Sequence, residues 1–506
     1  MKFAKQLSAA LLAAVTIVGL GACGSGSGSD TSSSGASGGQ IHIGRTTPFD
    51  GFKLDQELLN ESYAISASVI EPLIRVGDVG KKLEPGIAKS WEYNANNTQL
   101  TIHLTPGVKF SNGKPLTAED VAFSVDVWKK GPNYGANYAS IASTTIKDPQ
   151  TIVFNLSAPD TSLPAFLCYS VAGVVPKDFA GMSEDAYWQK PIGAGAFAVS
   201  KWSTDGDVVL KKNPDYYRKG YPKVDQITNS FVPDVNSVAL QLKSNQIDIV
   251  NQLDTVVAKS LDQSFIADVP PHQTPTLIFN TTNQYLSNKN VRQAIGYALD
   301  YKSILKTGFN GYGTVPSSSL PPNLENSTKA SNGYYKQDTA KAKQLLQGVT
   351  LPSKPLTLTY STSLGGQAAV QIVQENLKKI GIPVELKAVD GGTWSGALSD
   401  GSFDMILFST NANSPDLIDA PAYVAGTKML YSQMDAAKLG QLITSYKATG
   451  DTKQKVGIVQ QIDDYLTDEA PYLVLSDCKV IDARQTNIKG LNVQPWSTYY
   501  YDTLSR

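Results

Sequence analysis

The side chains that most often carry catalysis are scarce in this 506-residue chain. Its three histidines, His42, His103 and His272, lie far apart in the sequence, and His103 falls in an alternating, strand-like run. A hydrolase needs a nucleophile beside a base; HExxH is absent, and the one GxSxG match, GASGG at residues 35–39, lies in a Gly/Ser-rich run rather than at a strand-to-helix turn. The GxxxxGK[ST] loop that cradles nucleotide phosphates is absent too. We therefore expect a protein that is not an enzyme and has no cofactor.

Metal and redox chemistry also lack a recognisable pattern. Three scattered histidines do not provide the ligand cluster that a transition metal needs. Cys168 and Cys478 lack CxxC spacing and are expected to be structural. Whether they form a disulfide stays open, because the sequence does not show whether their Cα atoms approach one another.

The third cysteine, Cys23, has a different setting. Lys2 and Lys5 precede an apolar stretch from Ala9 to Leu20, and small residues lead up to the cysteine. This is the layout of a signal peptide, and the stretch is shorter than the ~20 residues of a membrane span. The run Leu20-Gly21-Ala22-Cys23 resembles the lipobox of bacterial lipoproteins, in which the cysteine is acylated after cleavage.

The resemblance implies that residues 1–22 are removed on export and that Cys23 anchors the mature chain to the outer face of the cell membrane. Residues 24–39 are almost entirely Gly, Ser, Ala and Thr, so we expect residues 23–39 to form a flexible tether. The alternative is ordinary secretory cleavage beside an incidental cysteine.

The charge balance argues against nucleic acid as a partner. The chain has 44 basic and 45 acidic residues and no basic block. No further apolar run is long enough to span a membrane, so we expect a globular body outside the bilayer. This body exceeds the ~250–300 residues at which a single core stops growing, which predicts two or more lobes.

Short strand-like runs alternate with amphipathic helical segments, so the fold class is α/β. The runs with strand alternation are Gln40–Gly44, Gln99–Leu104, Thr151–Leu156, Leu356–Tyr360 and Val384–Val389. The predicted helices are Leu116–Lys130, Val291–Leu305, Asp338–Leu346 and Ala368–Ile380. Thr117 and Asp120 have the spacing of a capping box at the start of the first helix.

A series of motifs follows along nearly all of the mature chain. The most specific is LTIHLTPGVKFSNGKPLTAEDVAFS, from Leu100 to Ser124, with a strand, a Phe-Ser-Asn-Gly turn and a Thr-Ala-Glu-Asp-Val helix start. The others are Glu71-Pro72-Leu73, LEPGIAKSW (83–91), PIGAGAF (191–197), LKKNPDYYRKG (210–220), VRQAIGYALD (291–300), DTAKAKQLLQG (338–348) and APYLVL (470–475). In order and spacing they resemble the peptide and nickel class of bacterial extracytoplasmic solute-binding proteins, called family five.

Glycines in these motifs are expected to shape turns. Asn112-Gly113 supplies a turn with φ > 0, and Gly193 and Gly195 permit a tight bend.

The resemblance implies a two-lobed, periplasmic-binding-protein-like fold of type II with an extra inserted sub-domain. Lobe I would comprise residues 40–62, 183–268 and 482–506, and the inserted sub-domain residues 63–182. Lobe II would comprise residues 269–481. Two crossing strands, near Asp268–Pro275 and Ser476–Ile481, would form the hinge.

In function, the resemblance implies the substrate-binding lipoprotein of an ABC importer, acting as a monomer. The lobes would close on a ligand, and a permease would recognise the closed form, with ATP hydrolysed by separate cytoplasmic subunits. The expected ligands are oligopeptides, held mainly by main-chain hydrogen bonds to exposed strand edges.

The segment that faces the ligand in peptide-binding relatives corresponds here to Phe403–Pro421. It departs from their pattern, because Ser409-Thr410 replaces Gly-Trp and Asn413 replaces an aspartate that pairs with the peptide ammonium. The candidate ligand contacts from this segment are Ser409, Thr410, Asn411 and Asn413.

A buried ammonium needs a carboxylate or several acceptors, and Asp416 lies three residues after Asn413. Asp416 is therefore a further ligand-binding candidate. Its alternative role is an Asx turn after Pro415.

Aromatic and hydroxyl side chains complete the candidate set. Trp394, Tyr134 and Tyr138 could line the cleft as flat amphipathic surfaces, or could instead pack in the core. Thr46 and Thr47 follow the first strand, where related proteins present backbone to the ligand. Arg292 is excluded, because the family motif has an arginine there whatever the ligand, and a structural ion pair is expected instead.

Other ligands stay possible on this fold. The uncharged run Ser409–Asn413, together with Trp394, would also suit an oligosaccharide, the main alternative ligand. A metal chelate is a minor option, and an adhesin or the ligand-binding subunit of a sensor is a third class of function.

Overall fold

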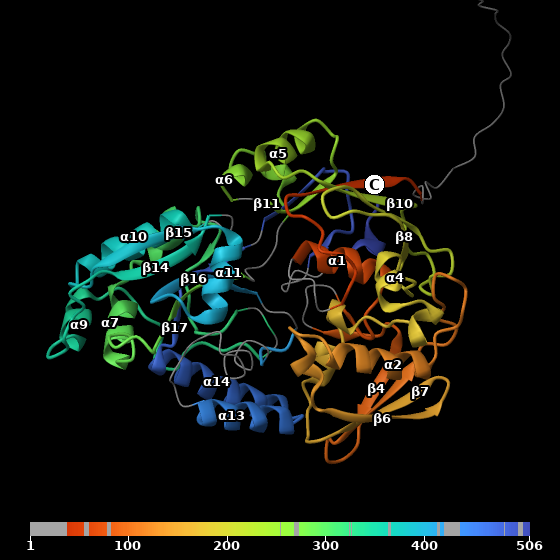
Figure 1. Ribbon diagram of the computed structural model, residues 1–506, viewed down its shortest axis with the longest axis horizontal. Helices are drawn as coiled ribbons and strands as arrows, with labels where there is room; N and C mark the ends of the chain where they lie inside the picture. Colours follow the sequence, from red (N-terminus) through yellow and green to blue (C-terminus); the bar gives the residue numbers. More distant parts are fainter. Residues whose placement is uncertain are drawn as a thin grey trace, which may run out of the picture. The chain divides into compact units, whose positions relative to one another are not determined.

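The computed structural model describes residues 38–54, 60–77, 82–253, 255–267, 273–322, 324, 326–362, 366–411, 415–418, 436–479, 481–493 and 499–506. Cys23, Asn413 and His272 lie outside these residues. Within them the chain forms a six-stranded, a seven-stranded and a four-stranded sheet, together with two short two-stranded ladders (Figure 1).

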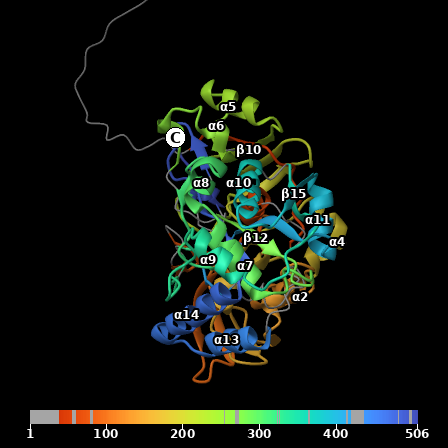
Figure 2. The same ribbon diagram turned by 90° about the vertical axis from the view of Figure 1, so that its left-hand side faces the viewer.

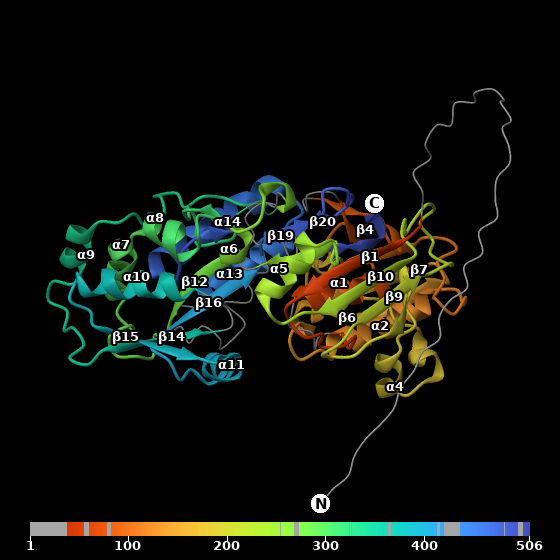
Figure 3. The same ribbon diagram turned by 90° about the horizontal axis from the view of Figure 1, so that it is seen from above.

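The first sheet has the strand order β19-β11-β1-β10-β9-β8, and Figure 3 shows β1, β10 and β9 side by side. Its strands are β1 (Gln40–Arg45), β8 (Phe197–Lys201), β9 (Val208–Lys212), β10 (Gln226–Phe231), β11 (Ile249–Leu253) and β19 (Ile481–Arg484). β1 is parallel to β10 and β11, whereas β8, β9 and β19 are antiparallel to their neighbours. Helices α5 (Val235–Lys243) and α6 (Thr255–Ala258) join β11 and β19 in a small apolar cluster.

The second sheet has the order β13-β18-β12-β16-β14-β15, and β17 also pairs with β12. Its strands are β12 (Gln273–Phe279), β13 (Gly313–Thr314), β14 (Leu356–Ser361), β15 (Val384–Val389), β16 (Met405–Asn411), β17 (Tyr472–Val474) and β18 (Asp477–Cys478). β14, β15 and β16 are parallel, and β12 is antiparallel to β16.

Helices of this second region are α7 (Lys289–Ala298), α8 (Tyr301–Ser303), α9 (Thr339–Leu345), α10 (Gln367–Lys378), α11 (Gly391–Asp400), α13 (Ala436–Ala448) and α14 (Thr452–Glu469). Figure 2 shows α13 and α14 next to each other, and these two helices are in contact.

The third sheet is antiparallel with the order β4-β5-β7-β6, and α2 packs against it (Figure 1). Its elements are β4 (Ala88–Tyr93), β5 (Gln99–Leu104), α2 (Ala118–Lys129), β6 (Ile141–Asp148) and β7 (Thr151–Leu156). The predicted capping box of Thr117 and Asp120 is confirmed, and Val121, Ser124, Val125 and Trp128 lie on the buried face of the helix. This sheet lies within the segment predicted as the inserted sub-domain.

The remaining elements are short. They are α1 (Asn60–Val69), β2 (Arg75–Val76), β3 (Leu83–Glu84), α3 (Leu163–Phe166), α4 (Glu184–Gln189), β20 (Asn492–Val493), β21 (Tyr499–Tyr500) and several 3-10 turns. Among the helices that the structure describes, none is both long enough and apolar enough to cross a membrane.

The predicted helix Val291–Leu305 is wrong in its continuity. The helix α7 ends at Ala298, because Leu299 takes an extended conformation (φ −72°, ψ 132°). Asp300 then caps a new helical turn by accepting a hydrogen bond from the Ser303 amide at 3.0 Å. The apolar spacing continues across this break, so periodicity alone did not reveal it.

The motif glycines act differently from one another. Gly113 has φ +80°, as expected for its turn. Gly193 and Gly195 do not have positive φ; they are needed because the chain passes close to the end of α1. A Cβ at Gly193 would lie 1.8 Å from the Val69 carbonyl oxygen, and the Gly195 amide donates to that same oxygen at 2.9 Å. The chain bends at residues 194–196 as predicted, and the close backbone approach is the reason that both positions lack a side chain.

The two cysteines in the described residues are free and buried. The Cys168 thiol donates to the Ala165 carbonyl at 3.0 Å, and burial raises the pKa of Cys478 to about 12. They do not form the disulfide that the sequence left open.

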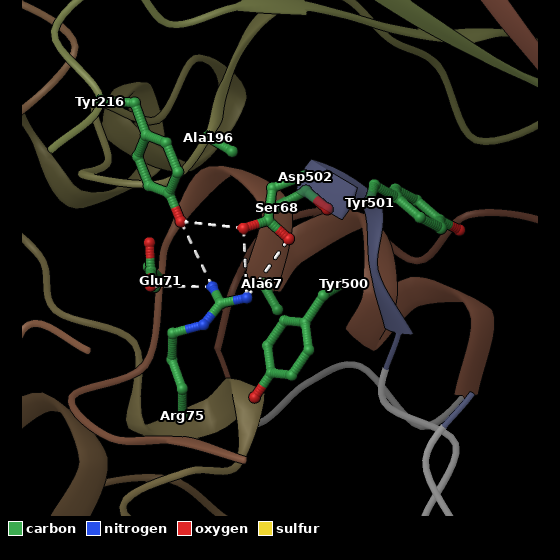
Figure 4. A pocket seen from close by; sticks show the side chains of 9 residues that line it. All are labelled: Ala67, Ser68, Glu71, Arg75, Ala196, Tyr216, Tyr500, Tyr501 and Asp502. Atoms are coloured by element: carbon green, nitrogen blue, oxygen red, sulfur yellow. Dashed lines mark hydrogen bonds and ion pairs between the residues drawn. The ribbon is translucent and has the colours of Figure 1, made fainter. Parts of the chain in front are cut away.

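A buried ion cluster ties the C-terminal segment to the residues after α1. The Arg75 guanidinium lies between the Glu71 carboxylate, at 3.0 Å, and the Asp502 carboxylate, at 3.2 Å (Figure 4). Arg218 also pairs with Asp502, at 2.6 Å. The cavity beside them has a volume of about 10 Å³ and holds no more than one water molecule. The ion cluster is therefore a structural element rather than a ligand site.

Replacing Arg75 with methionine should lower the free energy of unfolding by about 3–5 kcal/mol, because two carboxylates would lose a buried counter-ion. Urea unfolding followed by circular dichroism measures this loss. Lys201→Met is the matched control: Lys201 is 68% exposed and 3.9 Å from Asp207, so its loss should cost about 0.5 kcal/mol or less. Equal losses in both variants would contradict a stabilising role for the cluster.

Candidate functional site

Two connections lead from the first sheet to the second. The outgoing one follows Ala267, whose amide donates to the Asp482 carbonyl at 2.8 Å, and it enters β12 at Gln273. The returning one leaves β18 at Cys478 and enters β19 at Ile481. Both fall within the segments predicted for the hinge, and their action as a hinge stays a prediction.

These connections meet equivalent edges of the two sheets. In the first sheet β19 begins with Ile481 opposite Leu253, at the carboxyl end of β11. In the second sheet β12 begins with Gln273 opposite Asn411, at the carboxyl end of β16. Ligands of open α/β sheets bind outside the carboxyl ends of the parallel strands. The topology therefore selects these two edges as the candidate binding site.

The candidates Ser409, Thr410 and Asn411 form the last three residues of β16. Their backbones pair with Pro275, Thr274 and Gln273 of β12, immediately after the outgoing connection. The Ser409 hydroxyl is buried and makes no hydrogen bond with the residues that the structure describes. This part of the predicted site therefore lies at the selected edge and contains a hydroxyl without a hydrogen-bond partner among the described residues.

Trp394 lies on α11 beside the same strand. Asp390 begins this helix by accepting a hydrogen bond from the Thr393 amide at 3.0 Å. The Trp394 indole N–H donates to the Leu407 carbonyl at 3.0 Å, and its ring stacks on Phe408 with the centroids 5.7 Å apart. Both rings are partly exposed. The structure thus places a fixed aromatic pair beside β16, on the face of the sheet opposite to the Ser409 side chain.

Thr46 and Thr47 follow β1 at the carboxyl edge of the first sheet, and both are partly exposed. The buried Arg45 shapes this end of the strand. Its guanidinium donates to the carbonyl oxygens of Thr47 and Gly206. The backbone at Thr46 and Thr47 is therefore fixed by a charged side chain from the preceding residue.

The two tyrosine candidates belong to an aromatic group near the third sheet. Tyr138 is 1% exposed, packs against Trp128 and donates to the Phe166 carbonyl at 3.1 Å. Tyr134 is partly exposed, and its hydroxyl lies 3.1 Å from that of Tyr63. These contacts favour core packing for Tyr138, which was the alternative to lining the cleft. The side chain of Tyr134 is partly exposed.

Asp416 is 6% exposed and already has several partners. Its carboxylate accepts hydrogen bonds from the Ile418 amide at 3.0 Å and the Tyr446 hydroxyl at 2.6 Å, and Lys455 lies at 3.8 Å. Burial raises the pKa of this carboxyl, and Lys455 opposes the rise. The Ile418 contact is an Asx turn, so the geometry favours the local role over ammonium binding.

Asp477 is a residue that the sequence analysis missed. It lies on β18 and is 4% exposed, and burial raises its pKa to about 7. Its Oδ1 atom makes no hydrogen bond with the described residues. The available signal was a lone acidic residue two positions after the apolar run Leu473–Leu475.

The two histidines in the described part of the chain lie apart from each other. His42 lies on β1 and His103 on β5, in different sheets. Among the described residues no group of three or more His, Cys, Asp or Glu side chains is arranged to hold a metal ion. Arg292 makes the expected ion pair with Glu469 at 3.6 Å and also donates to the Ala470 carbonyl.

Comparison with known proteins agrees with this geometry. A family model described as bacterial extracellular solute-binding proteins, family 5 Middle, matches residues 82–428. The glutathione-binding protein GsiB of Salmonella typhi is 24% identical over 472 residues, which cover 87% of this chain and 89% of that protein.

Two solved structures share the fold. The periplasmic binding protein DppA from Helicobacter pylori, in complex with the peptide STSA, has a TM-score of 0.78 and 22% identity, covering 92% of this chain and 98% of that one. AgaA from A. tumefaciens R10, in complex with agropinic acid, has a TM-score of 0.80 and 23% identity, with the same two coverages. The fold is therefore the two-lobed periplasmic-binding-protein fold that the motifs predicted.

The match to the family model spans more than half of the residues, and the two solved structures share the fold over 92% of the chain. The chain belongs to family 5 of the bacterial extracellular solute-binding proteins, which bind substrates for ABC importers outside the cytoplasm rather than converting them.

Proposed function

We propose that this chain captures short peptides and delivers them, as a monomer, to the permease of an ABC importer whose ATPases are separate subunits. The observation that carries the proposal is the pair of connections joining the carboxyl edges of the two sheets. The glutathione and peptide ligands named for its relatives support this substrate class.

A peptide suits the groups at these edges. Its backbone offers amides and carbonyls at regular intervals, so a strand end can bind it without reading its sequence. The end of β16, from Ser409 to Asn411, and the segment Thr46–Thr47 after β1 provide such backbone on the two sheets. The hydroxyl of Ser409 provides a further polar group. The Trp394–Phe408 pair adds apolar surface for a side chain.

Two joined edges also explain how binding becomes a signal. A ligand that contacts both edges binds the closed form more tightly than the open one, and this difference in affinity is what shifts the population of the two forms. Contacts on one sheet alone would bind the ligand without favouring closure. Thr46 and Thr47 on one side and Ser409–Asn411 on the other are the residues proposed to make the two halves of the site.

We assign the chain to the outer face of the membrane through acylation of Cys23. A single lipid chain gives only reversible binding, whereas stable anchoring takes two signals, which the diacylglyceryl and N-acyl groups of a lipoprotein supply. The Gly/Ser-rich residues 24–39 would then separate the binding protein from the lipid surface.

Peptides should co-purify with the chain from Gly24 onward, because main-chain binding tolerates many sequences. Mass spectrometry of the released ligands identifies them, and calorimetry compares a peptide pool with an oligosaccharide pool. Heat from peptides alone is the expected result. Binding of oligosaccharides without any response to peptides would contradict the substrate class while leaving the transport role intact.

Replacing Asp416 with alanine should lower the free energy of unfolding by about 1–3 kcal/mol, because the Ile418 amide and the Tyr446 hydroxyl lose their acceptor. Peptide affinity, measured by calorimetry below the melting temperature, should stay unchanged. A large loss of affinity in a protein of unchanged stability would instead assign Asp416 to the ligand ammonium.

Replacing Cys23 with alanine should move the protein from the membrane fraction to the soluble fraction of the exporting cell, since the acylated side chain is lost. Labelling with radioactive palmitate should mark the wild-type chain and not the variant. Continued membrane association and labelling of the variant would contradict the anchor. Cys168→Ala serves as the control, because Cys168 is buried and cannot be acylated in the folded protein.

A further inference from the structure

Asp477 differs from the other buried carboxylates that the structure describes. Asp502 pairs with Arg75 and Arg218, Asp248 with Arg506 at 2.6 Å, Asp160 with Lys447 at 3.3 Å and Asp416 with Lys455. Asp463 lacks a cation but accepts a hydrogen bond from the Ser319 amide at 2.7 Å. Asp477 makes no ion pair with a described residue, and its Oδ1 atom accepts no hydrogen bond from one.

A carboxylate without a partner is unfavourable in the interior, because burial removes the water that stabilises its charge. Structural carboxylates therefore pair with a cation or accept hydrogen bonds, as the other buried ones do here: Asp120, Asp463 and Asp482 accept from backbone amides. An unpaired one is typical of a site that receives a cation from outside the chain. The missing partner of Asp477 thus points to a ligand with a positive charge.

The backbone places Asp477 at the candidate site. On this side of β12, Thr276 pairs with Val474 and Gln273 pairs with Cys478. The returning chain therefore has one more residue between its two paired positions than β12 has, and this extra residue lies opposite Thr274. This bulge, made by Ser476 and Asp477, directly precedes the returning connection. On its other side Asp477 pairs with the exposed Thr314 of β13.

Gly313 allows this close packing. It has φ +148°, and a Cβ there would lie 2.3 Å from the Asp477 carbonyl oxygen. Only glycine lets β13 approach β18 so closely, which fixes the backbone on both sides of Asp477.

The aromatic pair lies on the same side of the sheet. Thr276 is opposite Phe408, and Thr274, two residues earlier, has the same orientation along β12. Asp477 is opposite Thr274 on the far side of β12, so two strand spacings, about 10 Å, separate it laterally from Phe408. An extended peptide covers this distance with about three residues.

We propose that Asp477 is the anionic partner of the ligand's ammonium group, so that the protein selects peptides with a free amino terminus. This inference rests on the proposed function, because it names the chemical group that the same site recognises. It assigns to β18 the role that the sequence comparison sought in the segment around Asn413 and Asp416.

The assignment makes binding dependent on pH. The described residues on the strands paired with this segment, Gln273, Thr274, Gly313 and Thr314, are uncharged, and the titratable residues Cys478 and Lys479 follow Asp477 in the sequence. A carboxyl with a pKa of about 7 is largely protonated at pH 6 and ionised at pH 8. A bound ammonium stabilises the ionised form, so affinity should rise as the pH rises from 6 to about 7.5, with release of protons on binding. Above that pH the rise should stop, because the peptide α-amino group, with a pKa of about 8, loses its own proton.

The test uses calorimetry on the full mature protein with a pool of lysine-free tripeptides to hexapeptides, before and after acetylation of their amino termini. At pH 8 the wild type should bind the free-amine pool more tightly by about tenfold or more. Asp477→Asn should lose this preference and the pH dependence of affinity. Asp463→Asn, which changes a buried carboxyl on α14, should keep both.

Thermal unfolding without ligand provides a second readout. A carboxyl whose pKa is raised by folding destabilises the protein as the pH rises towards and above that pKa. Asp477→Asn should therefore raise the melting temperature at pH 8, and the gain should shrink as the pH falls to 5. An unchanged or lower melting temperature at pH 8 would overturn the claim that the charge lacks a partner.

The outcomes separate the two proposals. Peptide binding with equal affinity for both pools, or with the same preference in Asp477→Asn as in the wild type, overturns the role of Asp477 and leaves peptide transport standing. Failure of the wild type to bind either pool overturns the peptide function itself, and the assignment of Asp477 with it.

Discussion

The start of β12 is the constraint on which the rest of the structure depends. Its first residue, Gln273, pairs with Asn411 on one side and with Cys478 on the other. This double pairing brings three things together: the entry of the chain into the second sheet, the end of β16, and the point where the chain leaves. Because the same two connections begin at the carboxyl edge of the first sheet, backbone geometry alone brings the candidate ligand-binding residues to the joined edges.

Much of this architecture could be predicted from the sequence, because local signals and tertiary structure agree. The strands β1, β5, β7 and β15 follow from alternation of polarity, and α2 follows from its capping box. Motif order predicted the family and the positions of the two connections. Local periodicity failed where tertiary contacts decide: Leu299 breaks a helix whose apolar spacing continues, and Gly193 is required by a neighbouring carbonyl rather than by its own turn.

The candidate site was predictable only in part, because a site depends on pairings that a sequence does not state. Ser409, Thr410 and Asn411 were found by their position in a family segment, and they lie at the joined edges. Asp416 looked equivalent from its spacing, yet Tyr446 and Lys455, more than 25 residues away, provide its partners. Asp477 gave the opposite error: nothing in the sequence shows that a buried aspartate lacks a counter-ion among the described residues, and only the contacts of the folded chain reveal it.

Hydrogen exchange with and without peptide tests the central claim most directly, since the claim is that one ligand contacts the carboxyl edges of both sheets. Amide exchange should slow at Ser409–Asn411 and around Thr46–Thr47 together when peptide is added, because both edges lose access to water in the closed form. Slowed exchange at one edge alone, or only on an unrelated strand such as β6, would contradict the account.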